Sequence, residues 1–155
     1  MSANANLKDT VERIVAAHAT LEGPLLPILH ALQAELGYIP REAIPTIAHG
    51  LNLTRAEVYG VVSFYHDFRE SPPGRRIVKL CRAEACQAVG AREIHEHVLK
   101  HFKIGWGETT ADGALTIEAV YCLGLCSLSP AALIDGEPVA GLHDEAKMIA
   151  AIEAP

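Results

Sequence analysis

A strand, a helix and a second strand between residues 76 and 121 place the strongest constraint on the fold of this chain. The pattern predicts strands over 76–80 and 115–121, the second with apolar residues at alternate positions. The helix between them begins after Cys86 and has one apolar face, formed by residues spaced three or four apart: Ala91, Ile94, Val98 and Phe102. Such a crossover joins parallel strands in the right-handed sense, so both strands end at the same edge of a sheet.

All four cysteines of the chain follow these two strands. Cys81 and Cys86 come after the first strand with four residues between them, and Cys122 and Cys126 come after the second with three. Because the two strands end at one edge, we expect the four thiols to converge there. The carboxyl edge of an open α/β sheet is also where ligands usually bind.

Four converging thiolates can hold an iron–sulfur cluster or a zinc ion. A [2Fe–2S] cluster takes two thiolates on each iron, which suits two separated pairs, and a four-residue gap also occurs in plant-type ferredoxins. Zinc sites with four cysteines have gaps of about two to four residues, so a structural zinc-binding module is the alternative. Disulfides are not expected, since nothing marks the chain as secreted and its size allows a core without them. Neither pair has the two-residue gap of a thiol–disulfide redox motif.

Several residues of the cysteine loops could act on the charge of a cluster. An oxidised [2Fe–2S] cluster with four thiolates carries a charge of about −2, so the loops must bring backbone N–H groups close to it. Gly124, inside the second pair, serves that need. Arg82 could offset the charge and Gln87 could donate to a sulfur, although exposed loop residues more often simply face water.

The composition excludes several classes of protein. Half of the 155 residues are hydrophobic, enough for one domain with a sizeable core or for a small domain with a helical appendage. The net charge of −6 is spread along the chain, so we expect no nucleic-acid partner. The start of the chain lacks a secretory pattern, and no segment approaches the ~20 apolar residues that cross a bilayer. We expect a cytoplasmic protein without membrane insertion.

Paired prolines at positions 72 and 73 predict a boundary between two domains, because they disfavour helix in the residues before them. Residues 1–72 are predicted to form a helical bundle, in which Thr54 and Glu57 make a capping box at the start of the last helix. Residues 75–155 are predicted to form an α/β domain. In it, a hairpin near 132–139 and a closing helix near 144–152 follow the second cysteine pair, which gives a thioredoxin-like topology.

Four strings of residues carry a family resemblance: CRAEACQ at 81–87, YCLGLCSLSP at 121–130, LGYIP at 36–40 and VYGVVSFY at 58–65. They resemble the thioredoxin-like [2Fe–2S] subunit family, and the resemblance covers nearly the whole chain. It implies a thioredoxin-like [2Fe–2S] domain preceded by a small helical bundle. It also implies that one [2Fe–2S] cluster is ligated by all four cysteines: Cys81, Cys86, Cys122 and Cys126.

Within this family, the residues between Cys81 and Cys86, together with Gln87, are most similar to those of the gamma subunit of molybdenum-dependent, NAD-linked formate dehydrogenase. Equivalent subunits of complex I (NADH-quinone oxidoreductase) and of NAD-reducing hydrogenase are the alternatives. The resemblance implies a partner subunit that binds FMN, NAD and further iron–sulfur clusters, and a third subunit whose molybdenum cofactor oxidises formate. This chain would exchange single electrons with the flavin and would have no catalytic residue of its own.

Three histidines of the predicted crossover helix, His95, His97 and His101, are interpreted as a solvated helix face. A metal pair at His97 and His101 is the less favoured interpretation, because no carboxylate or cysteine motif accompanies it.

Apolar residues of the last bundle helix are interpreted as core, because helices of a small bundle need an inward face: Val58, Val61, Val62 and Tyr65. Three aromatic residues at the end of this helix, Phe64, Tyr65 and Phe68, are expected to anchor contact with the flavin-bearing subunit.

Overall fold

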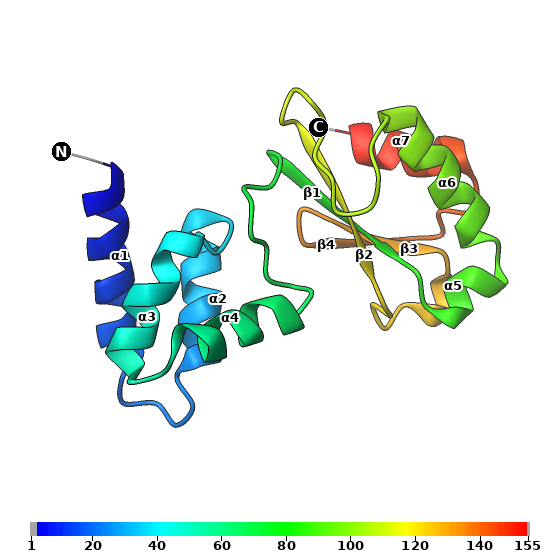
Figure 1. Ribbon diagram of the computed structural model, residues 1–155. Helices are drawn as coiled ribbons and strands as arrows, with labels where there is room; N and C mark the ends of the chain where they lie inside the picture. Colours follow the sequence, from blue (N-terminus) through cyan, green and yellow to red (C-terminus); the bar gives the residue numbers. More distant parts are fainter. Residues whose placement is uncertain (1–2, 155) are drawn as a thin grey trace. The chain divides into compact units, whose positions relative to one another are not determined.

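The computed structural model describes residues 3–154 of the chain. The chain divides into two compact units, Met1–Pro72 and Pro73–Pro155, and Figure 1 shows that the first is helical whereas the second contains the sheet. No helix within residues 3–154 is long and apolar enough to cross a membrane.

The first unit consists of helices with identifiable start and stop signals: α1 (Ala3–His18), α2 (Leu25–Leu36), the 3-10 turn η1 (Arg41–Ala43), α3 (Ile44–Leu51) and α4 (Arg55–Phe64). Gly37 ends α2 in the left-handed conformation, with φ of 84°, which a glycine adopts without steric cost. The capping box predicted at the start of α4 is present: Thr54 Oγ1 accepts from the N–H of Glu57, whose carboxylate accepts from the N–H of Thr54.

The core of the first unit is a single apolar cluster between its helices, whose largest fully buried members are Ile28, Leu29, Leu32, Ile39 and Ile47. Val58 and Val62 join it from α4, as expected, but Tyr65 does not and is 44% exposed. Phe68, expected at a partner surface, is instead buried, with its ring 5.0 Å from that of His30. The chain turns after Phe64, so the aromatic residues that follow leave the helical period.

The second unit is built on a sheet of β1 (Arg76–Cys81), β2 (Leu115–Val120), β3 (Ala131–Ile134) and β4 (Glu137–Ala140), in the order β2-β1-β3-β4. β1 and β2 are parallel, as the crossover predicts, and β3 and β4 form the expected hairpin. β1 pairs with β3 in the antiparallel sense. The parallel register matches Cys81 with Val120, so β1 and β2 end side by side.

The connection from β1 to β2 contains two helices, where the sequence predicts one. The short α5 (Glu84–Ala88) includes Cys86, and α6 (Ala91–Phe102) begins after Gly90, whose φ of 87° separates the two. A helix cannot continue through a residue in the left-handed region. Cys86 therefore lies on a helical turn and not in a loop that precedes the helix.

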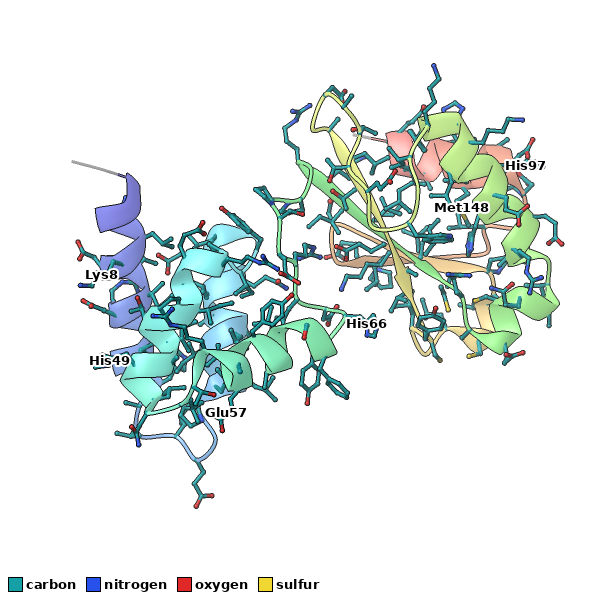
Figure 2. The ribbon with its side chains drawn as sticks, viewed as in Figure 1. Lys8, His49, Glu57, His66, His97 and Met148 are labelled. Atoms are coloured by element: carbon teal, nitrogen blue, oxygen red, sulfur yellow. The ribbon has the colours of Figure 1, made fainter. Side chains whose placement is uncertain are left out.

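Helices α6 and α7 (Glu145–Glu153) lie side by side and cover one face of the sheet (Figure 1). Their apolar faces pack against the alternate residues of β1 and β2 that point to this side, among them Val78, Leu80 and Ile117. Figure 2 shows Met148 of α7 directed into this core, and Met148 is fully buried.

The three histidines of α6 are not one solvated face. His95 is 2% exposed, and the prediction that it faces water is wrong. His97 and His101 are exposed but paired with α7: His97 Nδ1 contacts the carboxylate of Glu145, and His101 Nε2 lies 3.2 Å from a carboxylate oxygen of Glu153.

Candidate metal centre

The two cysteine loops begin at neighbouring positions on the carboxyl edge of the sheet. Cys81 is the last residue of β1, and the N–H of the following Arg82 donates to the carbonyl oxygen of Val120, the last residue of β2, at 2.7 Å. The second loop, with Cys122 and Cys126, continues from Val120. The two loops therefore begin side by side, as the parallel strands predict.

The thiol of Cys81 is the point at which the loops meet. It accepts hydrogen bonds from the N–H of Ala83 in its own loop, from those of Cys122 and Leu123 in the second loop, and from the thiol of Cys86. Burial raises the pKa of Cys81, but these hydrogen bonds outweigh it, so the pKa lies below its usual value. The surroundings of Cys81 thus favour a thiolate.

Cys86 is the second buried thiol, and the two side chains are 2% and 3% exposed. Burial, and then the hydrogen bond and charge of Cys81, raise the pKa of Cys86. The N–H of Ala131 and the hydroxyl of Ser129 act in the opposite direction. These two donors belong to the segment after the second loop, so both cysteine loops and the start of β3 surround the buried pair.

Cys122 and Cys126 form an exposed pair, with their sulfur atoms 3.7 Å apart. The hydrogen bond and charge of Cys122, followed by burial and the charge of Cys81, raise the pKa of Cys126. The interaction of Cys126 with Cys81 links this pair to the buried one.

The second loop turns sharply because two of its residues are left-handed. Cys122 has φ of 72° and Gly124 has φ of 77°. For a residue with a side chain this conformation costs roughly 1–2 kcal/mol, and such strain is concentrated at functional sites. A Cβ atom on Gly124 would meet no atom within 4 Å, so the position requires glycine for its backbone conformation and not for space.

The donor set fits a binuclear cluster. All four cysteines are free thiols, and the structure arranges them as two pairs that meet through Cys81. Within residues 3–154, no three His, Cys, Asp or Glu side chains are grouped to hold one metal ion. Two pairs of thiolates, with backbone N–H groups directed at sulfur, are what a [2Fe–2S] cluster takes from a protein.

The first loop also carries a cation that the sequence alone does not place. The guanidinium of Arg82 lies over the ring of Trp106, with Cζ 4.8 Å from the ring centroid. Sequence reasoning did not single out Trp106, which lies in the segment between α6 and β2, and the only signal is its position between Gly105 and Gly107. Gln87, considered above as a donor to a sulfur, donates from Nε2 to the carbonyl oxygen of Arg82 at 3.3 Å.

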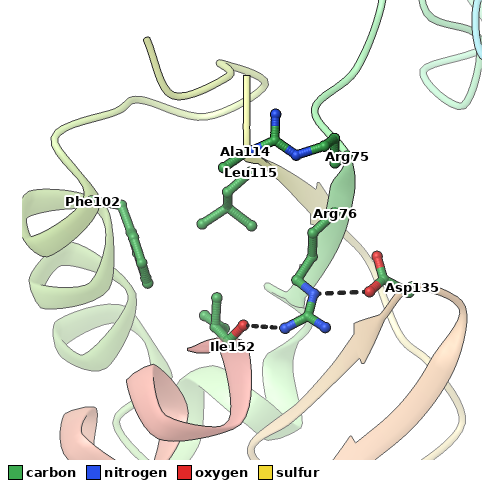
Figure 3. A pocket seen from close by; sticks show the side chains of 7 residues that line it. All are labelled: Arg75, Arg76, Phe102, Ala114, Leu115, Asp135 and Ile152. Atoms are coloured by element: carbon green, nitrogen blue, oxygen red, sulfur yellow. Dashed lines mark hydrogen bonds and ion pairs between the residues drawn. The ribbon is translucent and has the colours of Figure 1, made fainter. Parts of the chain in front are cut away.

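A cavity of about 440 Å³ in the second unit lies at the opposite end of β1 from Cys81 (Figure 3). Arg76 closes one side of it: its Nε is 2.9 Å from Oδ2 of Asp135, and its Nη1 donates to the carbonyl oxygen of Ile152 at 2.7 Å. These contacts hold the end of α7 to the sheet, so Arg76 is a structural residue and no part of the cysteine site.

Comparison with known proteins supports the same assignment. The family model of the thioredoxin-like [2Fe–2S] ferredoxins matches residues 11–154. An NADH-quinone oxidoreductase subunit of Mycobacterium bovis is 32% identical over 133 residues, which are 86% of this chain and 53% of that protein. The NADP-reducing hydrogenase subunit HndA of Solidesulfovibrio fructosivorans is 37% identical over 120 residues, 77% of this chain and 70% of that one.

A crystal structure of NAD+-reducing [NiFe]-hydrogenase in the H2-reduced state contains a similar fold, with a TM-score of 0.68 and 32% sequence identity. The match covers 83% of this chain and 21% of the hydrogenase chain. This chain thus spans about half of the length of the mycobacterial relative and a smaller share of the hydrogenase chain. Because the family model matches most of its length, the chain belongs to the thioredoxin-like [2Fe–2S] ferredoxin family, which implies one [2Fe–2S] cluster.

Proposed function

We propose that this chain is an electron-transfer iron–sulfur subunit of an NAD-linked oxidoreductase, with one [2Fe–2S] cluster ligated by Cys81, Cys86, Cys122 and Cys126. The observation that carries the proposal is the meeting of the two cysteine loops at the Cys81 sulfur, which accepts backbone hydrogen bonds from both. Two pairs of thiols at one sheet edge match the two thiolates that each iron requires.

The chain would act as a holder for the electron carrier. When bound, the cluster takes up and releases one electron at a time. The N–H groups of Cys122 and Leu123 would stabilise negative charge at Cys81, and burial of Cys81 and Cys86 would keep water from one side. We assign no catalytic residue to this chain, so bond-breaking chemistry would belong to other subunits.

The partner that we propose is a subunit that binds FMN, NAD and further iron–sulfur clusters. The names of the relatives support this class, since they describe subunits of NADH-quinone oxidoreductase and of an NADP-reducing hydrogenase. Single electrons would pass between the flavin of that subunit and this chain. Phe64 and Tyr65 are the exposed aromatic residues at the end of α4, and we propose them as part of the contact.

For the complex as a whole we favour an NAD-dependent formate dehydrogenase, in which a further subunit oxidises formate at a molybdenum cofactor. This finer assignment is supported by the filling of the first cysteine loop, Arg82 to Ala85, and by Gln87. NADH-quinone oxidoreductase and NAD-reducing hydrogenase are the alternatives that the relatives favour.

The ligand assignment is tested by loading the purified chain with iron and sulfide without oxygen. We expect about two irons and two sulfides per chain and, after reduction with dithionite, an electron paramagnetic resonance signal of a [2Fe–2S] cluster. Each Cys→Ser variant should hold less cluster, whereas Ser127→Ala, in the same loop as Cys126, should load like the original chain. A colourless protein with about one zinc per chain would contradict the proposal.

The identity of the complex is tested by affinity purification of this chain from its source, followed by identification of the co-purifying subunits. Formate-dependent reduction of NAD+ by that preparation, with molybdenum present, supports the formate dehydrogenase assignment. Hydrogen-dependent reduction, or quinone reduction with NADH, would replace it with one of the alternatives.

A further inference from the structure

Arg82 lies in the first cysteine loop, and its backbone is hydrogen-bonded to a residue next to each of the two loops. Its N–H donates to Val120, directly before the second loop, at 2.7 Å. Its carbonyl oxygen accepts from Nε2 of Gln87, directly after Cys86, at 3.3 Å. A peptide bond joins Arg82 to Cys81, so the backbone of this cation is fixed within one residue of a proposed cluster ligand.

The side chain of Arg82 is fixed as well. Its guanidinium lies over the indole ring of Trp106, and a cation over this face is attracted by the ring. Trp106 in turn meets the ring of His95 edge to face, with the ring centroids 5.6 Å apart. His95 lies on α6 and is buried, so the three side chains form a stack that connects the first cysteine loop to the core.

The positive charge of this stack resides on Arg82. Burial, and then the charge of Arg82, lower the pKa of His95 to about 4, so its ring is uncharged near neutral pH. Neither ring nitrogen of His95 has a hydrogen-bond partner among the residues that the structure describes. The contribution of His95 to the stack is therefore packing against Trp106.

We propose that Arg82, held in position by Trp106, is a positioning cation that raises the reduction potential of the cluster. This inference rests on the proposed ligation by Cys81 and its three partners. One electron converts one ferric ion of the cluster to ferrous, and the charge of the site changes from about −2 to about −3. A fixed positive charge on the residue next to a ligand stabilises the reduced state more than the oxidised state, so reduction becomes easier.

A second arginine provides a matched control. Arg75 is in the same unit but at the other end of β1 from Cys81, roughly 20 Å away along an extended strand. It is partnered by the carbonyl oxygen of Asp112 and not by a cysteine loop. Charges this far apart are largely screened at about 0.1 M salt, so Arg75→Gln removes an equal charge that has little effect on the cluster.

The test is a potentiometric titration of the loaded full-length chain, followed by the electron paramagnetic resonance signal. Arg82→Gln should shift the midpoint potential to more negative values, and by more than Arg75→Gln shifts it, because the Coulomb energy falls with distance. Trp106→Leu keeps the charge of Arg82 but removes the ring that holds its side chain in place. The midpoint potential of this variant should therefore lie between those of the original chain and Arg82→Gln, and it should depend more on salt. Arg82→Lys keeps the charge, so its midpoint potential should be closer to that of the original chain than the potential of Arg82→Gln is.

Equal potentials for Arg82→Gln and Arg75→Gln would overturn the role of Arg82. A shift in Arg82→Gln with none in Trp106→Leu, at low and high salt, would overturn the role of Trp106. Because Arg82 is exposed, its variants are expected to fold. If Trp106→Leu does not fold, the Arg82 variants still decide the inference. An original chain that assembles no cluster would instead contradict the proposed function, so the two failures can be told apart.

Discussion

The backbone N–H of Cys122 donates a hydrogen bond to the thiol of Cys81, forty-one positions earlier in the chain. Cys122 also has a left-handed backbone, with φ of 72°, which is uncommon for a residue with a side chain. The loop conformation and the surroundings of the buried thiol therefore depend on one another. Changes in the second loop should affect the first pair of cysteines.

Gly124→Ala should weaken the second loop without any steric clash. Its φ of 77° disfavours alanine by about 1 kcal/mol, while the added Cβ would meet nothing within 4 Å. We expect a lower unfolding midpoint in urea and incomplete loading with iron. Gly60→Ala is the matched control, since Gly60 lies inside α4 with equally open space and should gain stability. If both variants behave alike, backbone conformation is not what the loop requires of Gly124.

Arg76→Gln should destabilise the second unit, because Arg76 joins Asp135 to the end of α7. Hydrogen bonds to a charged group contribute about 1.5–3 kcal/mol, and three are lost here, to Asp135, Ile152 and Ala154, although partial exposure of Arg76 reduces the effect. Urea unfolding of Arg76→Gln, Asp135→Asn and the double variant measures the coupling directly. Additive effects of the two substitutions would show that the pair contributes nothing as a pair.

Thr54→Ala should shorten α4 at its start, since the threonine hydroxyl caps the N–H of Glu57. Loss of such a cap costs about 1 kcal/mol, and Thr54→Ser should restore it. Thermal unfolding followed by circular dichroism compares the three proteins. Equal stability of the alanine and serine variants would contradict the importance of this cap.

The same capping box predicts a dependence on pH. Hydrogen bonds from the backbone and then the side chain of Thr54 lower the pKa of Glu57 in the folded state. A lowered carboxyl pKa adds stability above the pKa of the unfolded chain, and this stability is lost as the pH falls through the folded value. Glu57→Gln should therefore flatten the stability profile in the acid range. An unchanged profile would exclude this linkage.

His95 should make the second unit less stable in acid. Burial lowers its pKa to about 4 from the 6.5 of a free histidine, so below pH 6.5 the unfolded state binds a proton that the folded state does not. Stability should fall between pH 7 and pH 4 by on the order of 3 kcal/mol from this residue alone. His95→Leu should remove that part of the slope. Parallel slopes for His95→Leu and the original chain would contradict a buried, neutral imidazole.

Phe64 and Tyr65 should matter for assembly and not for folding. They are 71% and 44% exposed, and their ring centroids are 5.1 Å apart. Replacing both with serine should leave thermal unfolding and cluster loading unchanged but reduce recovery of the flavin-bearing subunit on purification. Phe68→Ser should instead lower stability, because Phe68 is buried. Full recovery of the subunit with the double variant would exclude this surface.

Local patterns were sufficient to predict much of the fold. The parallel β1 and β2, the hairpin of β3 and β4 and the capping box at Thr54 each depend on residues close in sequence. The common edge at which the two cysteine loops begin then follows from strand direction alone. These features could be predicted because periodicity and turn chemistry are properties of short segments.

Other features depend on tertiary contacts, and these were not predicted. His95 follows Ile94 on α6 and looks like a polar face, but Trp106 from the segment after the helix covers it. Phe68 is buried against His30 of α2, which no pattern around Phe68 indicates. The position of Arg82 over Trp106 is a tertiary contact of the same kind. Burial of a single side chain depends on what packs over it, and a sequence pattern does not contain that information.

The unequal burial of the two cysteine pairs has a consequence for how the site is filled and damaged. Cys81 and Cys86 are enclosed, whereas Cys122 and Cys126 face solvent. Iron and sulfide delivered by an assembly factor would approach from the side of the second pair, and oxidants would arrive by the same route. In the empty chain, the close sulfur atoms of Cys122 and Cys126 are the thiols that an oxidant reaches first. Docking of another subunit over that side would close this route to oxidants and to further iron and sulfide.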